Sequence, residues 1–222
     1  MYTSKKIGMK NLKTGLLIAF VGIFSLGMNA QNYDKAPKMG VKGGLSLSNL
    51  YVDNIDDDEM LTGFNIGLFA KFPLAEKFAL QTEAYYTNKG AKLTYDDSFG
   101  SGSTKFKLDY IEVPLLAVYN ITQNFNVHAG GYVGYLISGK VTNESESGAF
   151  DFVEDLNTDD FNRIDAGLAF GLGYDFNPIN IGVRYYYGLT VVGKEQTFSG
   201  FNLTFPDAKN SALQVYASFS FN

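Results

Sequence analysis

Most of this chain alternates, residue by residue, between apolar side chains and small or polar ones, and this restricts its fold more than any other feature. In RIDAGLAFGLGYDF (163–176) one phase is entirely apolar, and the other is mainly charged residues and glycine. The segments 126–138, 179–191 and 213–221 show the same pattern. A two-residue period is typical of β-strands whose faces meet different surroundings. The chain is therefore expected to be all-β.

Eight such segments follow one another, and the connections between them alternate in length. The earlier, less regular segments cover 41–48, 64–72, 78–86 and 109–121. Long, polar and acidic connections are expected at 51–61, 90–105, 142–160 and 194–209. Tight turns are expected at 73–77, 122–124 and 177–178. This alternation predicts an antiparallel up-and-down barrel whose two ends face different surroundings.

The apolar phase is expected to point outward, into lipid. An eight-stranded barrel has an interior only just wide enough to be filled by side chains, so the large apolar residues of eight strands would overfill it. The opposite phase, rich in glycine and small polar residues, fits such a bore. The prediction for residues 39–222 is an eight-stranded antiparallel transmembrane β-barrel, since a tilted spanning strand needs about 9–11 residues.

The segment DYIEVPLLAVYNI (109–121) tests this arrangement because it carries Glu112 and Pro114 in an apolar run. Burying a carboxylate in hydrocarbon is costly, and proline removes a hydrogen bond from a sheet. In the barrel, Glu112 faces the lumen. Pro114 shares that face and predicts a bulge or a local break in the ladder. Leu116 and Val118 fall in the lumen phase despite being apolar, which leaves the end of this strand ambiguous.

The first 30 residues have the features of a secretory signal peptide. Four lysines precede the apolar run GLLIAFVGIFSLGM (15–28), and cleavage is expected after Ala30. The alternative is a membrane anchor, but the run is shorter than the roughly 20 residues that a spanning helix needs. Residues 31–38 then form a short periplasmic tail.

Composition excludes several classes of function. The chain has 18 basic and 23 acidic residues, and four of the lysines belong to the expected signal peptide, so the remainder is strongly acidic. This balance argues against nucleic acid as a partner. The chain has no cysteine, so cysteine-based metal and redox sites are impossible, and no cofactor is expected.

Several of these segments together resemble a known family. YIEVPLLAVYNI and FNVHAGGYVGYLISGK, with FALQTEAYYTNKGAKL before them and RIDAGLAFGLGYDF after, are similar to the PorT-like outer-membrane β-barrel family, whose members often bear the name porin family protein. The resemblance covers residues 39–222. It implies a bacterial outer-membrane barrel that the general assembly machinery inserts, and the word porin describes fold rather than measured transport.

Charged residues in the lumen phase form the first candidate site. The predicted lumen charge network comprises Glu83, Glu112, Arg163, Asp165 and Arg184, with Lys42, Lys71 and Asp175 in the same phase. Arginine can bind a carboxylate through two parallel hydrogen bonds, which suits a bore of low dielectric constant. The favoured interpretation is a structural salt-bridge plug. An ion pathway or gate is the alternative.

The other candidates lie at the two ends of the barrel. Acidic side chains in the long connections are candidates for divalent-cation or partner contacts: Asp56, Asp57, Asp58, Glu59, Asp159 and Asp160. Neither cluster has calcium-loop spacing, so no metal site is predicted. His128, the only histidine, would face inward near a short turn. That position is unsuited to chemistry on outer-leaflet lipid, so no catalytic residue is predicted.

These observations lead to three hypotheses of different classes. The first is a non-enzymatic outer-membrane barrel with a structural, surface-binding or secretion- or assembly-accessory role. In this hypothesis the long loops are extracellular and the termini periplasmic. Its partners would be outer-membrane lipids, the assembly machinery and an unidentified surface or secretion partner. The second hypothesis is a narrow channel for ions or small solutes, and the third is a lipid-modifying hydrolase.

Overall fold

The computed structural model describes residues 36–51, 59–97, 100–145, 151–193, 196–198, 201–203 and 208–221. The expected signal peptide and residues 31–35 of the expected tail lie outside this set. Eight antiparallel strands form the barrel: β1 (Lys38–Tyr51), β2 (Glu59–Pro73), β3 (Phe78–Asp97), β4 (Gly100–Asn120), β5 (Phe125–Ser145), β7 (Ile164–Asp175), β8 (Ile179–Val191) and β11 (Lys209–Ser220). Smaller elements are β6 (Phe152–Asp155), η1 (Thr158–Asp160), β9 (Gln196–Phe198) and β10 (Phe201–Leu203).

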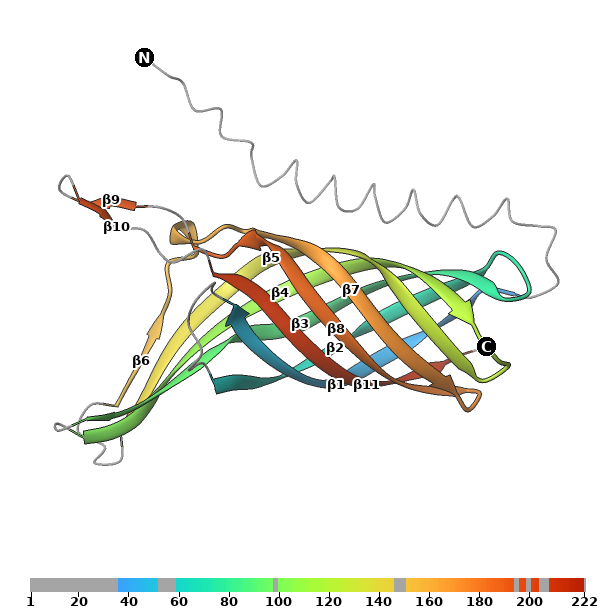
Figure 1. The fold of residues 1–222 in the computed structure, drawn as a ribbon, viewed down its shortest axis with the longest axis horizontal. Coiled ribbons are helices and arrows are strands. Elements are labelled where there is room, and N and C mark those ends of the chain that lie inside the picture. Colours follow the sequence, from blue (N-terminus) through green and yellow to red (C-terminus); the bar gives the residue numbers. More distant parts are fainter. Residues whose placement is uncertain are drawn as a thin grey trace, which may run out of the picture.

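The eight strands close into a ring (Figure 1). Each pairs with its neighbour in the barrel order, and β11 pairs with β1 over twelve residue positions, from Gly40↔Ser220 to Tyr51↔Lys209. Closure satisfies the hydrogen bonds of both barrel edges, as a strand in lipid requires. The predicted eight-stranded up-and-down barrel is confirmed. No helix among the described residues is long and apolar enough to cross a membrane.

The two ends of the barrel differ, as the connection lengths predict. At one end, here called the short-turn end, residues 74–77, 121–124 and 176–178 join consecutive strands. The described chain also begins and ends there, because Gly40 in β1 pairs with Ser220 in β11. β1, β3, β5 and β8 end at the opposite end, here called the long-loop end (Figure 1), and residues 52–58 and 204–207 of the expected long connections lie outside the described residues.

The outward face of the ring is apolar. Along β1, β2 and β8, the side chains of Leu45, Ile66 and Val183 are 62%, 60% and 42% exposed. The alternate side chains are buried, and Arg184, the neighbour of Val183, is 0% exposed. This arrangement is inverted relative to a water-soluble protein, and only a lipid surround makes such a surface tolerable.

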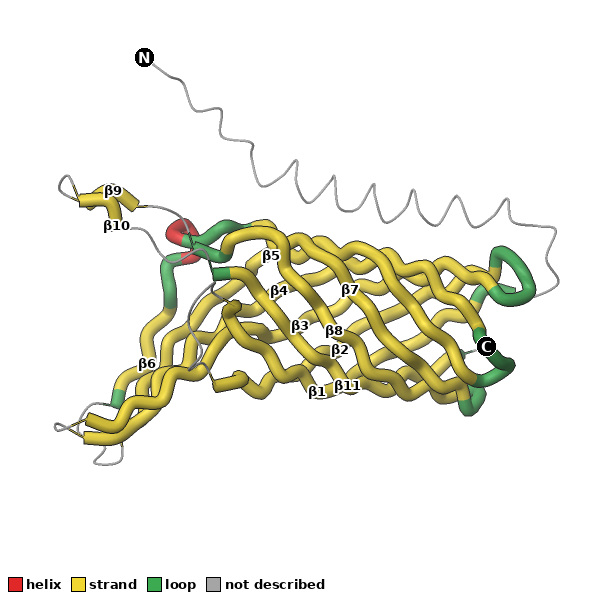
Figure 2. Tube along the Cα trace, viewed as in Figure 1, coloured by secondary structure: helices red, strands yellow, loops and turns green. Residues whose placement is uncertain are grey.

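Three neighbouring strands are much longer than a membrane requires. β3, β4 and β5 contain 20, 21 and 21 residues, whereas the other barrel strands contain 12 to 15. Figure 2 shows these three strands continuing past the others at the long-loop end. We call this extension, residues 91–105 and 139–145, the blade. β6 pairs with its β5 edge through Lys140↔Asp155 to Asn143↔Phe152.

The blade corrects the predicted connections at 90–105 and 142–160. Residues 90–97 and 100–105 continue a β-hairpin, in which Lys92 pairs with Lys105 and Thr94 with Ser103. In the first strand of the blade, Ala91, Leu93 and Tyr95 do alternate with polar residues, whereas the second strand begins with GSGST (100–104), which has no apolar side chain. A polar composition alone therefore does not distinguish a loop from paired sheet outside the membrane-spanning part of the barrel.

Pro114 breaks one ladder without producing a bulge. The pairing of β3 with β4 omits two residue pairs, between Thr82↔Leu115 and Tyr85↔Glu112, but keeps the same register on both sides. Pairing with β5 continues through Pro114↔Tyr132. A register shift does occur in this strand, between Asp109 and Tyr110. The predicted local break is present, and the missing proline N–H explains it.

Candidate functional site: the charged bore

Glu83 on β3 is the centre of a first ion cluster inside the barrel. Its two carboxylate oxygens accept from Arg184 Nη1 at 2.8 Å and Nη2 at 2.9 Å, which is a bidentate pair. Lys42 Nζ on β1 donates to the same carboxylate at 2.7 Å, and Gln81 Nε2 donates at 2.7 Å. Two cations therefore face one carboxylate across the bore.

His128 belongs to the same cluster. Arg184 Nε lies 3.0 Å from His128 Nε2, and because a guanidinium can only donate, this imidazole nitrogen accepts. The proton of the neutral ring then lies on Nδ1, which is 3.3 Å from Asn126 Oδ1. His128 is buried, faces inward as expected and acts as a structural acceptor for arginine.

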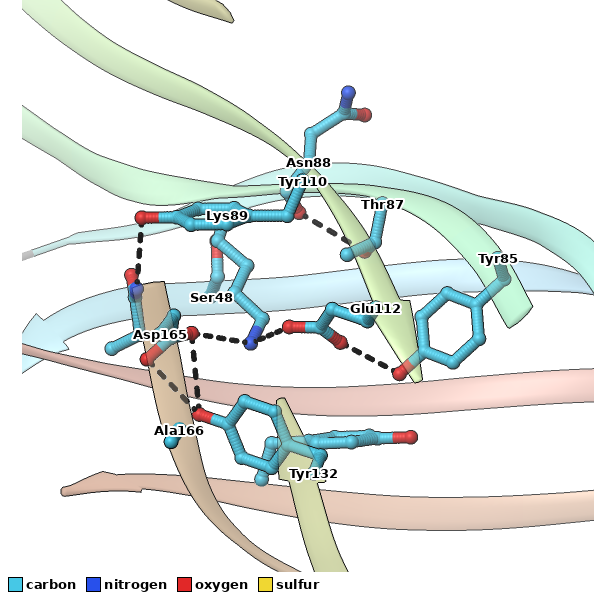
Figure 3. Close-up of polar contacts among 12 residues, drawn as sticks. Ser48, Tyr85, Thr87, Asn88, Lys89, Tyr110, Glu112, Tyr132, Asp165 and Ala166 are labelled. Atoms are coloured by element: carbon cyan, nitrogen blue, oxygen red, sulfur yellow. Dashed lines mark hydrogen bonds and ion pairs between the residues drawn. The ribbon is translucent and has the colours of Figure 1, made fainter. Parts of the chain in front are cut away.

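Lys89 on β3 is the centre of a second cluster (Figure 3). Its ammonium group forms ion pairs with Glu112 on β4 and, at 3.1 Å, with Asp165 on β7. Tyr85 Oη donates to Glu112 at 2.7 Å, and Tyr132 Oη lies 3.3 Å from Asp165. Here one cation faces two carboxylates.

Taken together, the two clusters are electrically balanced. Lys42, Lys89 and Arg184 oppose Glu83, Glu112 and Asp165, and all six side chains are buried. Tyrosine rings line the space between them: Lys42 Nζ lies 4.0 Å from the Tyr216 ring centroid, and Lys89 Nζ lies 4.4 Å from that of Tyr132. Cation–π contacts and ion pairs replace the hydration that the charges lose.

Glycine makes room for this network. A Cβ added at Gly171 on β7 would collide with the His128 imidazole, and one added at Gly182 on β8 would collide with the Tyr216 hydroxyl. Both glycines lie on the lumen face, opposite apolar residues that face lipid. The large charged and aromatic side chains of the bore therefore pack against the small residues of the lumen phase.

Above the ion clusters, towards the long-loop end, the bore is closed by apolar side chains. Leu108, Tyr110 and Leu136 are buried against Val192. Three partly buried side chains pack against this apolar plug: Leu50, Leu156 and Phe161. Leu116 and Val118, the residues in the unexpected phase, also point inward and are buried. The interior is thus a stack of layers rather than a uniformly polar bore.

Arg163 does not join the lumen network, which corrects its predicted place there. β7 begins at Ile164, so Arg163 lies in the preceding connection, beyond the paired strand. Its guanidinium donates to Asp159 at 2.7 Å, and this hydrogen bond raises the pKa of Arg163 above its usual range. The other four residues of the predicted network, Glu83, Glu112, Asp165 and Arg184, meet in the bore.

The acidic candidates of the connections are placed only in part. Asp56, Asp57 and Asp58 lie outside the described residues, as does the side chain of Glu59. Asp159 and Asp160 lie in η1, where Asp159 pairs with Arg163 rather than with its acidic neighbour. Across the part of the chain that the structure describes, no group of three histidine or acidic side chains could hold a metal ion.

Lys89 is the network residue that the sequence prediction missed. The odd-numbered phase that holds Gln81 and Glu83 continues through Thr87 to Lys89, so alternation pointed to the lumen. The sequence predicts a strand over 78–86 and a loop from residue 90, so Lys89 was not assigned to the lumen network. In the structure, β3 continues to Asp97.

The closed barrel with an apolar outer face and a filled bore defines a class, the small transmembrane β-barrel. A family model described as an outer membrane protein beta-barrel domain matches residues 29–192. The chain belongs to this family and is an outer-membrane β-barrel protein. No curated protein sequence matches it.

The solved structures to which the chain is similar include Ail and Neisserial surface protein A. Ail, the attachment invasion locus protein of Yersinia pestis, is 17% identical with a TM-score of 0.46, and Neisserial surface protein A is 16% identical with a TM-score of 0.47. Each match covers 84% of this chain and 100% of the other. Ail also has a structure in complex with the heparin analogue sucrose octasulfate.

Proposed function

We propose that this protein is a non-enzymatic, non-conducting outer-membrane barrel that presents the blade outside the cell as a binding surface. The observation that carries the proposal is the excess length of β3, β4 and β5. A spanning strand needs about 9–11 residues, and these strands have 20 or 21. The surplus forms paired sheet instead of loop, which gives a partner a rigid surface.

The outer edge of the blade favours binding. Among the described strands β6 pairs only with β5, so its other edge is open. Phe152 and Val153 on this strand are 49% and 63% exposed. Open strand edges and exposed apolar residues are features through which other chains dock. The partner is a surface or secretion component that the sequence does not identify.

The filled bore argues against the channel hypothesis. A conducting path would have to cross both the Arg184–Glu83 cluster and the apolar plug of Leu108, Tyr110 and Leu136. The six buried charges are paired with one another. Separating such pairs is costly in a medium of low dielectric constant.

The hydrolase hypothesis has equally little support in the geometry. The only histidine is buried in the bore with its Nε2 engaged by Arg184. A general base must be within reach of substrate, and His128 faces away from lipid.

We also retain the finer PorT-like assignment as part of the proposal. In this proposal the long-loop end is extracellular, and both termini are periplasmic.

Orientation is tested by cysteine labelling, which is clean because the chain has no cysteine of its own. Single variants Thr94→Cys in the blade and Glu76→Cys in a short turn are treated with a membrane-impermeant maleimide on intact cells. We expect Thr94→Cys to react at once and Glu76→Cys only after permeabilisation. The reverse pattern would invert the proposed topology.

Binding is tested by removing the blade tip. Cells expressing the full chain are compared with cells in which residues 94–103 are replaced by an Asn-Gly turn, which favours tight hairpins. Cell retention is measured on surfaces coated with sulfated polysaccharide, neutral polysaccharide or protein. We expect the full chain to increase retention on at least one coating and the shortened chain to lose the gain. Equal retention of both strains would reject the role of the blade.

A further inference from the structure

A cavity of about 420 Å³ lies where the blade meets the lipid-facing surface of the barrel. Its apolar side consists of Leu45, Leu61 and Phe64 from β1 and β2, and its polar side carries Lys105, Lys107 and Lys140 from β4 and β5. We call this cavity the lysine notch. It lies between an apolar wall and a basic wall, at the long-loop edge of the apolar outer face of the barrel.

The notch exists because β3 separates from β2 at this height. The register of the β2–β3 ladder shifts between Met60 and Asn65. Asn88 fills part of the gap: its side-chain oxygen accepts from the Phe64 backbone N–H at 3.2 Å, and its amide group donates to Asp109 at 2.8 Å. The opening is therefore braced by hydrogen bonds.

Two lysines of the notch form a like-charge pair, because Lys107 lies directly opposite Lys140. Lys105 lies opposite Lys92 of β3, which in turn lies opposite Glu59 of β2. Like charges in directly opposed positions destabilise a sheet. A bound anion would relieve this repulsion, so the arrangement favours an anionic ligand.

Described carboxylates pair with two of the three notch lysines. Lys105 pairs with Glu144 at 2.8 Å, and Lys140 lies 3.6 Å from Asp155. Both carboxylates are largely exposed, and exposed ion pairs are weak and easily exchanged. Lys107 has no ion-pair partner among the described residues. Of the described residues that line the cavity, three are lysines and one, Glu144, carries a carboxylate.

The apolar wall identifies the rest of the ligand. Leu45 and Phe64 are 62% and 46% exposed and are continuous with the belt that faces hydrocarbon. A ligand that fills the notch would lay acyl chains on this wall and bring phosphate to the lysines. Basic side chains at a membrane surface attract anionic headgroups.

We infer that the lysine notch binds a phosphate-bearing acylated glycolipid of the lipid A type, from the leaflet that surrounds the long-loop end. Leu45 and Phe64 contact its acyl chains. Lys105, Lys107 and Lys140 bind its phosphate. The notch would thereby fix the base of the blade to the membrane surface.

Binding of diphosphorylated lipid A to the full, detergent-solubilised barrel is measured by native mass spectrometry and by titration. The triple variant Lys105→Gln, Lys107→Gln, Lys140→Gln should bind at least tenfold more weakly, because each lysine near a headgroup contributes about fivefold. Dephosphorylated lipid A of the same acylation should bind the parent chain as weakly as it binds the variant. The corresponding triple arginine variant should restore binding of the phosphorylated lipid.

A matched control removes the same charge elsewhere. Lys38→Gln, Lys77→Gln, Lys209→Gln alters lysines outside the notch, at both ends of the barrel, and should keep the affinity of the parent chain. Heat-modifiable gel migration verifies that each variant is folded. Equal affinity of the notch variant and the control would overturn the inference. Displacement of lipid A by equimolar inorganic phosphate or phosphatidylglycerol would overturn it as well, since either would indicate a site without glycolipid specificity.

Discussion

Glu83 illustrates how single residues make a charged interior possible. Arg184 contributes two parallel hydrogen bonds to its carboxylate, and Lys42 contributes another. Neither cation can be removed without leaving a buried charge underpaired, and that penalty exceeds the net value of the pair itself. His128 and Tyr186 add contacts to the remaining guanidinium positions. Among these side chains, the loss of Arg184 should therefore destabilise the barrel most.

Replacing Arg184 with leucine should lower the free energy of unfolding by about 3–5 kcal/mol, because one partner of a buried ion pair is lost. The measurement is a urea titration of the barrel in lipid vesicles, followed by the gel mobility of the folded band. The other arginine serves as the control. Arg163→Leu removes only a partly exposed pair with Asp159 and should change the free energy by less than about 1 kcal/mol. Equal effects would place the two arginines in similar environments, contrary to the structure.

At the scale of the strand, each barrel element has one face for lipid and one for the bore. On β8, Val183 points outward between Leu172 of β7 and Val215 of β11, while Arg184 points inward. A strand of this kind is stable only in its own register, since a shift by one residue would move arginine into lipid. The burial pattern of β8 alternates accordingly.

Replacing Val183 with lysine should destabilise the barrel by about 2–4 kcal/mol, as expected for a cation near the bilayer midplane. Ile179→Lys tests the same face of the same strand at its short-turn end, where the cost should fall to about 0–1 kcal/mol. Unfolding titrations of both variants in vesicles give the comparison. Equal costs for Ile179→Lys and Val183→Lys would contradict the assignment of Val183 to the bilayer midplane and of Ile179 to its edge.

The blade should be separable from the barrel. Replacement of residues 94–103 by an Asn-Gly turn removes paired sheet that contributes nothing to either ion cluster or to the apolar plug. We expect the shortened chain to keep the unfolding midpoint of the parent and its heat-modifiable migration. A midpoint shifted strongly downward would show that the blade stabilises the barrel, and would require a shorter excision in the cell-retention experiment.

At the scale of the whole molecule, the barrel is a closed cylinder filled in layers. Polar side chains occupy the short-turn side, with Lys71 Nζ 3.6 Å from Asp175. The balanced ion clusters follow, and the apolar plug closes the long-loop side. In the proposed non-conducting barrel, a continuous aqueous path would have to cross each of these layers.

Planar-bilayer recordings of the purified protein should therefore show no stable single-channel steps. A large general porin, recorded under the same conditions, controls for successful insertion. Stable steps from this protein would contradict the filled bore and return the channel hypothesis to first place. Steps that disappear after removal of porin contaminants would leave the present account intact.

Local sequence was sufficient to predict the eight barrel strands and the direction of their faces, except at the end of the 109–121 strand. Alternation in 163–176 and 179–191 reports the contrast between lipid and bore directly, because every second side chain must suit hydrocarbon. The same reasoning placed Glu83, Glu112, Asp165 and Arg184 in the lumen phase. It could not say which of them pair, since residues as distant in the chain as Glu83 and Arg184 meet only when the ring closes.

Only the tertiary structure decided the features that lie beyond the contrast between lipid and bore, and the positions at which strands end. The blade lies beyond the lipid-facing part of the barrel, and the polar residues of GSGST (100–104) predict a loop although they pair as a strand. Arg163 has the correct phase but lies one residue before β7 begins, and strand ends depend on pairing rather than on local pattern. The lysine notch is lined by Leu45 of β1 as well as Lys140 of β5, and no local pattern encodes this meeting of distant strands.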